Sequence, residues 1–186
     1  NKFIFIGPSS KVLKKMGDKI KAKTAMKSFG VPCIPGFDGI LPDDPKKVLK
    51  DAETVGFPIM LKAIHGGGGR GMMIIHNPKE LADGMQITKS EAENAFGNGD
   101  LYFEKYFDKP RHIEIQVLCD NHGNAIHLGE RDCSLQRRNQ KVIEETTAVN
   151  ISREDISKIG NICTEACIKL GYTGAGTFEF LYQDGS

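Results

Sequence analysis

The sequence lacks a surplus of charge of either sign. Its 25 Lys and Arg residues are balanced by 24 Asp and Glu residues, so the formal net charge is only +1. A general nucleic-acid or membrane-surface partner favours a clear excess of basic residues. The chain also has no apolar run as long as a membrane span, and no signal-peptide pattern opens it. We therefore predict neither a nucleic-acid partner nor a membrane partner.

Cysteine pairs of the Cys-x-x-Cys type are absent, and the five cysteines are odd in number. Cys163 and Cys167 are spaced i and i+4 on one face of an expected helix, where they could bind a metal or be buried thiols. No histidine lies beside them, which favours buried thiols. We expect a reduced compartment: the cytoplasm, or the mitochondrial matrix if the source is eukaryotic.

The first half of the chain mixes expected strands and helices, in an ordinary globular composition with 39% hydrophobic residues. Asp18 is a good N-cap for a helix that stops before Gly30. The prolines of residues 31–36 exclude a helix and indicate a hinge or domain boundary. The expected elements are a buried strand at 3–6, helices at 18–29 and 45–54, strands at 59–64 and 72–75, and a helix at 78–96.

Beyond residue 100 the pattern becomes mostly strand, and residues 112–118 alternate strictly between polar and apolar side chains. Ser152 and Asp155 resemble a capping box at the start of a helix. The expected elements are strands at 101–106, 112–118, 125–128 and 176–182, and a helix that ends at Gly171. The last strand runs into a hairpin turn with no returning strand, and no Met opens the chain. We therefore expect a truncated fragment.

The strongest local signal is a run of five glycines within residues 66–71, between two apolar strands. Glycine costs conformational entropy on folding, and a plain hairpin needs only one or two. A long run lets bare backbone N–H groups surround a large anion and permits a flap to open and close. Its spacing matches neither the P-loop nor the Rossmann pattern. A floppy linker is the alternative, but Lys62 and Arg70 favour a phosphate-binding flap.

Other polar side chains are candidates only in combination. Lys19 starts a helix and would alone be a solvated charge. Glu104 closes a strand whose free edge would suit an adenine ring, and His112 lies on a polar strand face, where a structural histidine is the alternative. Glu179 lies between aromatic neighbours, where a carboxylate is costly unless it is paired or binds a cation such as Mg²⁺. The charged segment 130–141 is interpreted as a loop, either solvated or binding an anion or sugar hydroxyls.

Together these elements resemble the biotin carboxylase component of acetyl-CoA, propionyl-CoA and related carboxylases, within the ATP-grasp superfamily. The run QRRNQK after RDCS is highly specific, whereas the glycine run alone would be weak. The matching runs span essentially the whole chain, in order: FIGPSS, MGDK, VPCIPGFDG, GFPIMLKA, GGGGRGM, YFEKY, PRHIEIQVL, HGNAIHLGERDCSLQRRNQK and GAGTFEF.

The resemblance implies an α+β, ATP-grasp fold. Residues 1–33 would end a preceding domain and form a linker helix, and residues 34–106 would form a small α/β lid subdomain. Residues 107–186 would form part of a larger, mainly antiparallel sheet subdomain with helices.

The resemblance also implies site residues. Those that would contact ATP are Lys19 and Lys62 at the phosphates, the flap Gly66, Gly67, Gly68, Gly69, Arg70 and Gly71, then Glu104, Lys105, Tyr106 and Phe107 at adenine, and His112, Gln136 and Asn139 near the ribose. Lys141 would contact bicarbonate, and Glu179 would be the first of two acidic Mg²⁺ (or Mn²⁺) ligands.

By the same resemblance, the parent protein is an ATP-dependent ligase of fatty-acid biosynthesis or related pathways, and it is oligomeric. MgATP would phosphorylate bicarbonate, and CO2 from the resulting carboxyphosphate would be captured by biotin on a carrier protein or domain. A carboxyltransferase would then act on the acyl-CoA. The fragment itself would be inactive, because further family residues for metal, bicarbonate and biotin would lie beyond Ser186.

Two positions depart from the family pattern: Asn139 replaces a histidine common in acetyl-CoA carboxylases, and residues 146–148 replace an Ala-Pro turn. Two other functions remain open. A carbamoyl-phosphate synthetase-like ATP-grasp ligase would share the bicarbonate chemistry but should lack the RDCS and QRRNQK runs. A non-catalytic nucleotide-binding module should have lost its phosphate lysines or glycines, and here they are intact.

Overall fold

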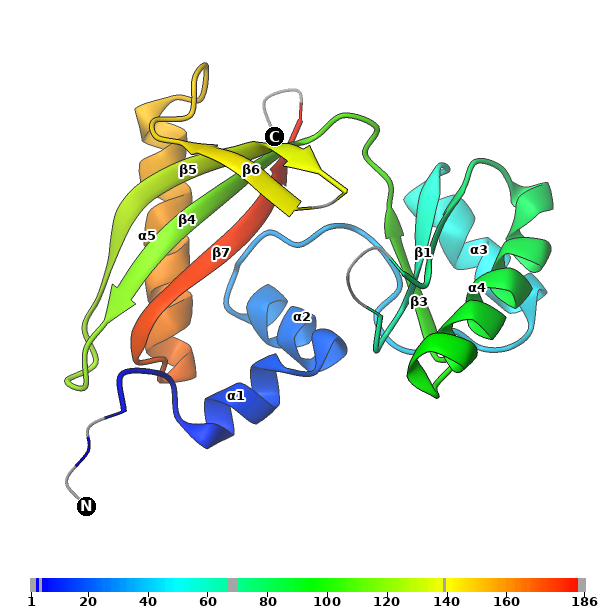
Figure 1. Cartoon of the computed structure of the whole chain (residues 1–186), viewed down its shortest axis with the longest axis horizontal. Helices are drawn as coiled ribbons and strands as arrows, with labels where there is room; N and C mark the ends of the chain where they lie inside the picture. The colour runs from blue at the N-terminus through cyan, green and yellow to red at the C-terminus, as the bar shows by residue number, and fades with distance from the viewer. Residues whose placement is uncertain (1–2, 4, 67–69, 139, 184–186) are drawn as a thin grey trace. The chain divides into compact units, whose positions relative to one another are not determined.

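The computed structural model describes residues 3, 5–66, 70–138 and 140–183 (Figure 1). Its contacts divide the chain into two compact units. We call Ile34–Asp108 the three-stranded unit, and Asn1–Cys33 together with Lys109–Ser186 the four-stranded unit. Within the described residues, none of the helices has the length and apolar content needed to cross a bilayer.

The three-stranded unit is an antiparallel sheet packed against helices. Its strands are β1 (Ile59–Ala63), β2 (Met72–Ile75) and β3 (Leu101–Lys105), in the order β2-β1-β3. Its helices are α3 (Pro45–Val55), the 3-10 turn η1 (Pro78–Glu80) and α4 (Leu81–Phe96). The expected elements of this segment are therefore confirmed, with ends that differ by at most three residues.

The core of this unit follows from the two-residue period of β1. Ile59, Leu61 and Ala63 are buried against α3 and α4, while Lys62 lies on the opposite face of the strand. A side chain at Gly84 of α4 would collide with Ile75 of β2, so this glycine lets the helix approach the sheet closely. The packing thus presents Lys62 away from the apolar core.

The four-stranded unit is an antiparallel sheet with a long helix on one face (Figure 1). Its strands are β4 (Arg111–Cys119), β5 (Ala125–Arg137), β6 (Gln140–Glu145) and β7 (Gly174–Tyr182), in the order β6-β5-β4-β7. Its helices are α1 (Ser10–Met16), α2 (Lys19–Ser28) and α5 (Arg153–Leu170). The predicted α+β class is confirmed.

The helix ends of this unit are set by local chemistry. The Asp18 carboxylate accepts from the backbone N–H groups of Ile20 and Lys21 and begins α2. Ser152 accepts from the Asp155 N–H and begins α5, and Gly171, with a φ of +67°, ends it. Both N-caps and the C-terminal glycine were predicted from the sequence, and they are confirmed.

Two expectations for this unit are wrong, and one helix was not expected. Phe3, Phe5 and Ile6 form no strand and are largely exposed, because no strand of the described residues supplies the hydrogen bonds that an apolar run needs. The helix α1 was not predicted, although Ser9 caps it. The charged segment 130–141 is not a loop: most of it lies in β5 and β6, where pairing satisfies the backbone and the charges project from the strands.

Candidate functional site

The glycine run of the three-stranded unit connects β1 to β2. Gly71 has a φ of +66°, and a side chain there would lie 2.9 Å from Cβ of Ala63, so only glycine suits the position. The Ala63 N–H donates to the Gly71 carbonyl (2.8 Å), and the Gly66 N–H donates to the Ala63 carbonyl (3.1 Å). These bonds hold the two ends of the run together. Residues 67–69, which include the predicted Gly67, Gly68 and Gly69, lie outside the described residues.

Lys62 and Glu104 form an ion pair across this sheet. The Lys62 Nζ lies 2.7 Å from the Glu104 Oε2, and the side chains are 24% and 12% exposed. The pair forms because Met60 of β1 is directly opposite Glu104, which places Lys62 on the neighbouring diagonal of the same face. The structure therefore brings a predicted phosphate lysine and the predicted adenine acid into direct contact.

The residues after Glu104 use most of their backbone donors within the unit. The Lys105 N–H donates to the Pro35 carbonyl (2.7 Å), and the Tyr106 N–H donates to the Pro58 carbonyl (3.1 Å). The Lys105 ammonium donates to the carbonyls of Gly56 and Phe57, at 2.9 and 3.1 Å. Within the described part of the chain, the Phe107 N–H makes no hydrogen bond, so this amide is available to a ligand.

A second polar group covers the face of the four-stranded sheet opposite α5. The side chains come from four strands and form a network: His112, Glu114 and Gln116 of β4, Arg131 and Cys133 of β5, Lys141 and Glu144 of β6, and Glu179 of β7. Glu114 is opposite Arg131 on one side and Glu179 on the other, so strand pairing alone aligns three charges in one row.

Glu114 is the centre of this network, and its side chain is 2% exposed. It accepts from the Arg131 Nη2 (2.6 Å) and forms a close ion pair with the Lys141 ammonium. Arg131 also donates to the Gln116 amide oxygen (2.9 Å) and pairs with Glu144 (3.2 Å). A buried carboxylate is stable only when it is paired and hydrogen-bonded in this way.

Lys141 also pairs with Glu179, at 3.0 Å from its Oε1, and the His112 Nε2 lies 3.5 Å from the Glu179 Oε2. Burial opposes the ionisation of Glu179, but Lys141 and, to a smaller extent, His112 lower the pKa of this carboxyl below its usual value. The predicted ribose histidine, bicarbonate lysine and metal acid are therefore neighbours. Strict alternation in 112–118 had placed Glu114 beside His112. Arg131 was missed because the segment 130–141 was interpreted as a loop, and Glu144, which follows that segment, was not singled out.

Two predicted residues of this unit remain: Gln136, which is paired with Lys141 of the network, and Lys19. The Gln136 amide donates to the Cys133 carbonyl (2.9 Å), which uses one donor of its side chain. Lys19 is exposed at the first residue of α2. The predicted Asn139 lies outside the described residues.

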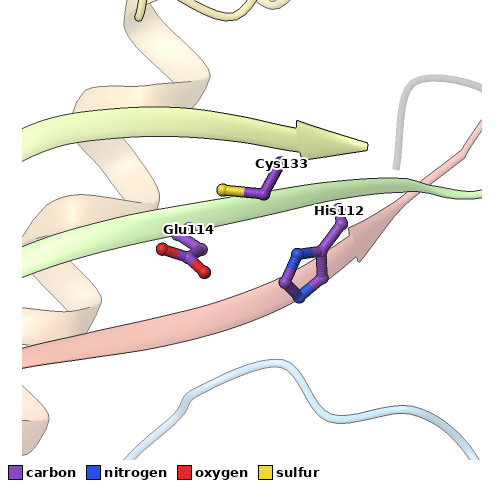
Figure 2. A group of neighbouring side chains, drawn as sticks. All are labelled: His112, Glu114 and Cys133. Carbon is purple, nitrogen blue, oxygen red and sulfur yellow. The ribbon is translucent and has the colours of Figure 1, made fainter. Parts of the chain in front are cut away.

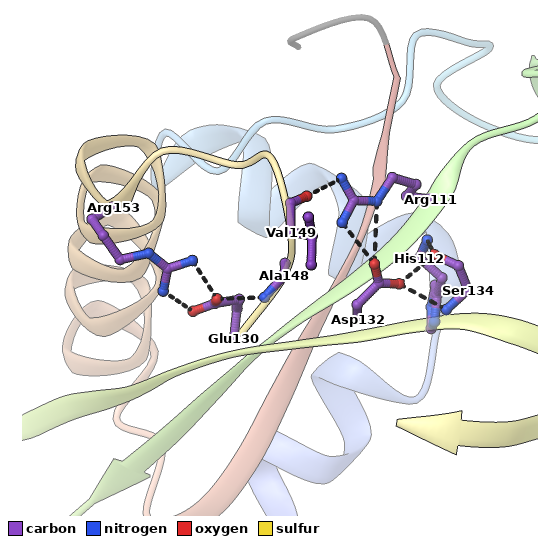
Figure 3. Close-up of polar contacts among 8 residues, drawn as sticks. All are labelled: Arg111, His112, Glu130, Asp132, Ser134, Ala148, Val149 and Arg153. Atoms are coloured by element: carbon purple, nitrogen blue, oxygen red, sulfur yellow. Dashed lines mark hydrogen bonds and ion pairs between the residues drawn. The ribbon is translucent and has the colours of Figure 1, made fainter. Parts of the chain in front are cut away.

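A third group of polar contacts lies on the face of the sheet that packs against α5 (Figure 3). The Arg111 guanidinium donates to Asp132 at 2.7 and 3.2 Å, and the Ser134 hydroxyl both contacts Asp132 closely and accepts from the His112 N–H (3.0 Å). Glu130 accepts from Arg153 of α5 (2.6 and 3.0 Å) and from the Ala148 N–H (2.9 Å). These bonds fix the backbone that carries His112 and the attachment of α5.

Comparison with known proteins bears on the whole chain. The profile of the family described as "Carbamoyl-phosphate synthase L chain, ATP binding domain" matches residues 18–186. The chain belongs to this family. Its relatives named biotin carboxylase include proteins from Allochromatium vinosum and Pseudomonas aeruginosa, which are 54% and 53% identical to the chain over 183 residues. These residues are 98% of the chain but 41% of each relative, so the chain spans about two fifths of their length.

Solved structures of family members have the same fold. The biotin carboxylase domain dimer of Hydrogenobacter thermophilus 2-oxoglutarate carboxylase, in complex with MgADP, ADP and bicarbonate, has a TM-score of 0.89 and 48% identity. A biotin carboxylase complex with β,γ-ATP from Campylobacter jejuni has the same two values. The chain is covered to 98% in both cases, and those chains to 40% and 41%. The predicted resemblance and the ATP-grasp fold are therefore confirmed.

The Mg²⁺ named in one of these structures suits the described residues. Mg²⁺ binds through one or two carboxylates together with phosphate oxygens and water. The Glu179 side chain is 58% exposed, and its lowered pKa keeps the carboxylate ionised at neutral pH. Glu179 can therefore supply one oxygen ligand.

Proposed function

We propose that the chain is the ATP-binding part of a biotin carboxylase, which uses MgATP and bicarbonate to carboxylate biotin on a carrier protein. The observation that carries this proposal is the position of Lys141, an ammonium group between the carboxylates of Glu114 and Glu179. Such a cation can bind a small anion if one carboxylate turns to another partner. A magnesium ion at Glu179 would release Lys141 in this way.

The three-stranded unit would bind the two ends of the nucleotide. Lys62 and the glycine run would neutralise phosphate charge, because an ammonium group and backbone N–H groups are strong donors to phosphate oxygens. The Glu104 carboxylate would accept from the adenine amino group, and the Phe107 N–H would donate to a ring nitrogen. Lys62 would leave Glu104 when phosphate binds, since both anions compete for one cation.

The four-stranded unit would supply the remaining contacts. His112, with Gln136 and Asn139, would lie near the ribose, and Lys19 near the phosphates. Lys141 would hold bicarbonate by charge, so that its oxygen is oriented towards the phosphoryl group that it attacks. Mg²⁺ would neutralise phosphate charge during that transfer. Exclusion of water would protect the carboxyphosphate.

Calorimetric titration with MgATP tests the nucleotide site. We expect Lys62→Met to weaken binding by about 1.5–3 kcal/mol, the usual loss for a hydrogen bond to a charged group. Lys47→Met is the matched control, since Lys47 is an exposed lysine of α3 in the same unit. Equal affinities for both variants and the parent chain would refute the assignment of Lys62.

A second experiment distinguishes the family's possible reactions. In the full-length enzyme, we expect bicarbonate-dependent ATP cleavage to be stimulated by biotin. Stimulation by ammonia instead would support a carbamoyl-phosphate synthetase-like ligase. ATP binding without cleavage under either condition would indicate a non-catalytic module.

A further inference from the structure

Three potential metal ligands converge on the face of the four-stranded sheet opposite α5 (Figure 2). His112 and Glu114 are two residues apart on β4, and Cys133 is on β5. Ile113 is paired with Asp132, so the pairing places His112 next to Cys133 and on the same face as Glu114. One ligand atom from each side chain lies within 4.8 Å of the other two.

The ligand types select the class of cation. A thiolate, an imidazole nitrogen and a carboxylate oxygen suit zinc, whereas magnesium prefers oxygen ligands alone. Zinc lies about 2.0–2.3 Å from such ligands, so tetrahedral ligands are roughly 3.3–3.8 Å apart. The limit of 4.8 Å exceeds this spacing by roughly 1 Å, so the three side chains would have to rotate towards one another to bind the ion.

Two of the ligands are suited to a cation by their surroundings. The His112 Nδ1 is buried and has no hydrogen-bond partner among the residues that the structure describes. A buried polar atom without a partner is costly, and a metal ion would satisfy it. Cys133 is fully buried, which keeps competing solvent away from its sulfur.

The charges around the three ligands also admit one further cation. The carboxylates of Glu114, Glu144 and Glu179 outnumber the cationic groups of Arg131 and Lys141 by three to two. A metal ion at Glu114 would compete directly with the Lys141 ammonium, which occupies the same carboxylate.

We infer that His112, Glu114 and Cys133 form a site for a thiophilic divalent cation of the zinc class, distinct from magnesium bound with nucleotide. Zinc and the Lys141 ammonium exclude one another at Glu114. The binding itself does not depend on the proposed function. If that function holds, zinc would inhibit the enzyme, because it would occupy the histidine assigned to the ribose and disturb the lysine assigned to bicarbonate.

Cobalt(II) is the probe that reports the sulfur ligand. We expect titration of the chain with cobalt to produce a thiolate-to-cobalt charge-transfer band in the near ultraviolet, which stoichiometric zinc abolishes. Cys133→Ser should lose the band and weaken zinc binding by more than about 100-fold, since even outer-shell changes cost 10- to 100-fold. Cys33→Ser is the control, because Cys33 is remote from β4 and β5 in sequence and only half-buried.

Two further variants separate this site from surface binding. His112→Gln should weaken zinc binding, and Lys141→Met should tighten it by removing the competing ammonium. Circular dichroism of each variant checks that the sheet is intact. Three outcomes would overturn the inference. The band could persist in folded Cys133→Ser, or Lys141→Met could leave the zinc affinity unchanged. The third outcome is an adventitious ion only, bound at exposed carboxylates without producing the band.

Discussion

The contact between Glu130 of β5 and Arg153 of α5 allows a quantitative prediction. The Glu130 side chain is 1% exposed, and it accepts from the Arg153 guanidinium at 2.6 and 3.0 Å and from the Ala148 N–H (Figure 3). Arg153→Ala leaves this buried carboxylate with one donor. Breaking a fully buried ion pair costs about 3–5 kcal/mol. Arg153 is 56% exposed and water reaches it, so we expect a loss of about 2–3 kcal/mol.

Lys169→Ala is the control, because it removes the cation of an exposed ion pair on the same helix. Lys169 of α5 lies 3.9 Å from Glu165, with side chains 50% and 66% exposed, and exposed pairs contribute at most about 1 kcal/mol. Urea unfolding followed by circular dichroism measures both losses. Hydrogen exchange of peptides from α5 and β5 shows that the transition belongs to the four-stranded unit.

The pH dependence of the effect has a definite sign. Burial raises the pKa of Glu130, but Arg153 and the Ala148 N–H outweigh it, so the net shift is downward from the usual value. The carboxylate therefore stabilises the fold above its unfolded pKa of about 4.3, and this contribution is lost as pH falls through the lower folded pKa. The difference between parent and Arg153→Ala should be full at pH 7 and disappear in acid. A loss for Arg153→Ala no larger than that for Lys169→Ala at pH 7 would refute the reasoning.

Three further predictions follow from single contacts. Gly160→Ala should destabilise the chain by about 1–2 kcal/mol in urea unfolding, because the added Cβ would lie 2.6 Å from the His127 ring. This loss should exceed the gain from alanine's better helix propensity, and His127→Ala in the same chain should recover part of it. Burial raises the pKa of the Cys163 and Cys167 thiols to about 12, so iodoacetamide at pH 8 should react with them only after urea is added. Mass spectrometry of the labelled peptides measures this reaction. Glu179→Gln should weaken MgATP binding about tenfold and change the binding of magnesium-free ATP less, because it removes a metal ligand in addition to the ion pairs with Lys141 and His112; equal losses would contradict a metal role.

Much of the fold could be predicted because its signals are local. Asp18 and Ser152 cap helices with their own side chains, and Gly171 ends a helix by adopting a positive φ. Each of these depends on residues at most a few positions away. Phe3, Phe5 and Ile6 show the limit of such signals, because a strand forms only where another strand pairs with it.

Part of the candidate site was recognisable from residue types in order along the chain. The glycine run and Glu179 drew attention because each is costly without a function, and Lys62 drew attention because it directly precedes the glycine run. Arg131 and Glu144 had no such signal, since charged residues in a charge-rich segment look solvated. Their role appeared only when β5 and β6 proved to be paired strands.

The sequence by itself determined most of the element types, the caps of α2 and α5 and the family, because these depend on short-range patterns and motif order. The tertiary structure alone decided which charges meet. Lys62 and Glu104 are 42 positions apart, and Lys141 and Glu179 are 38 apart. The strand register selects these partners, and a slip of one residue would turn each side chain to the other face of its sheet.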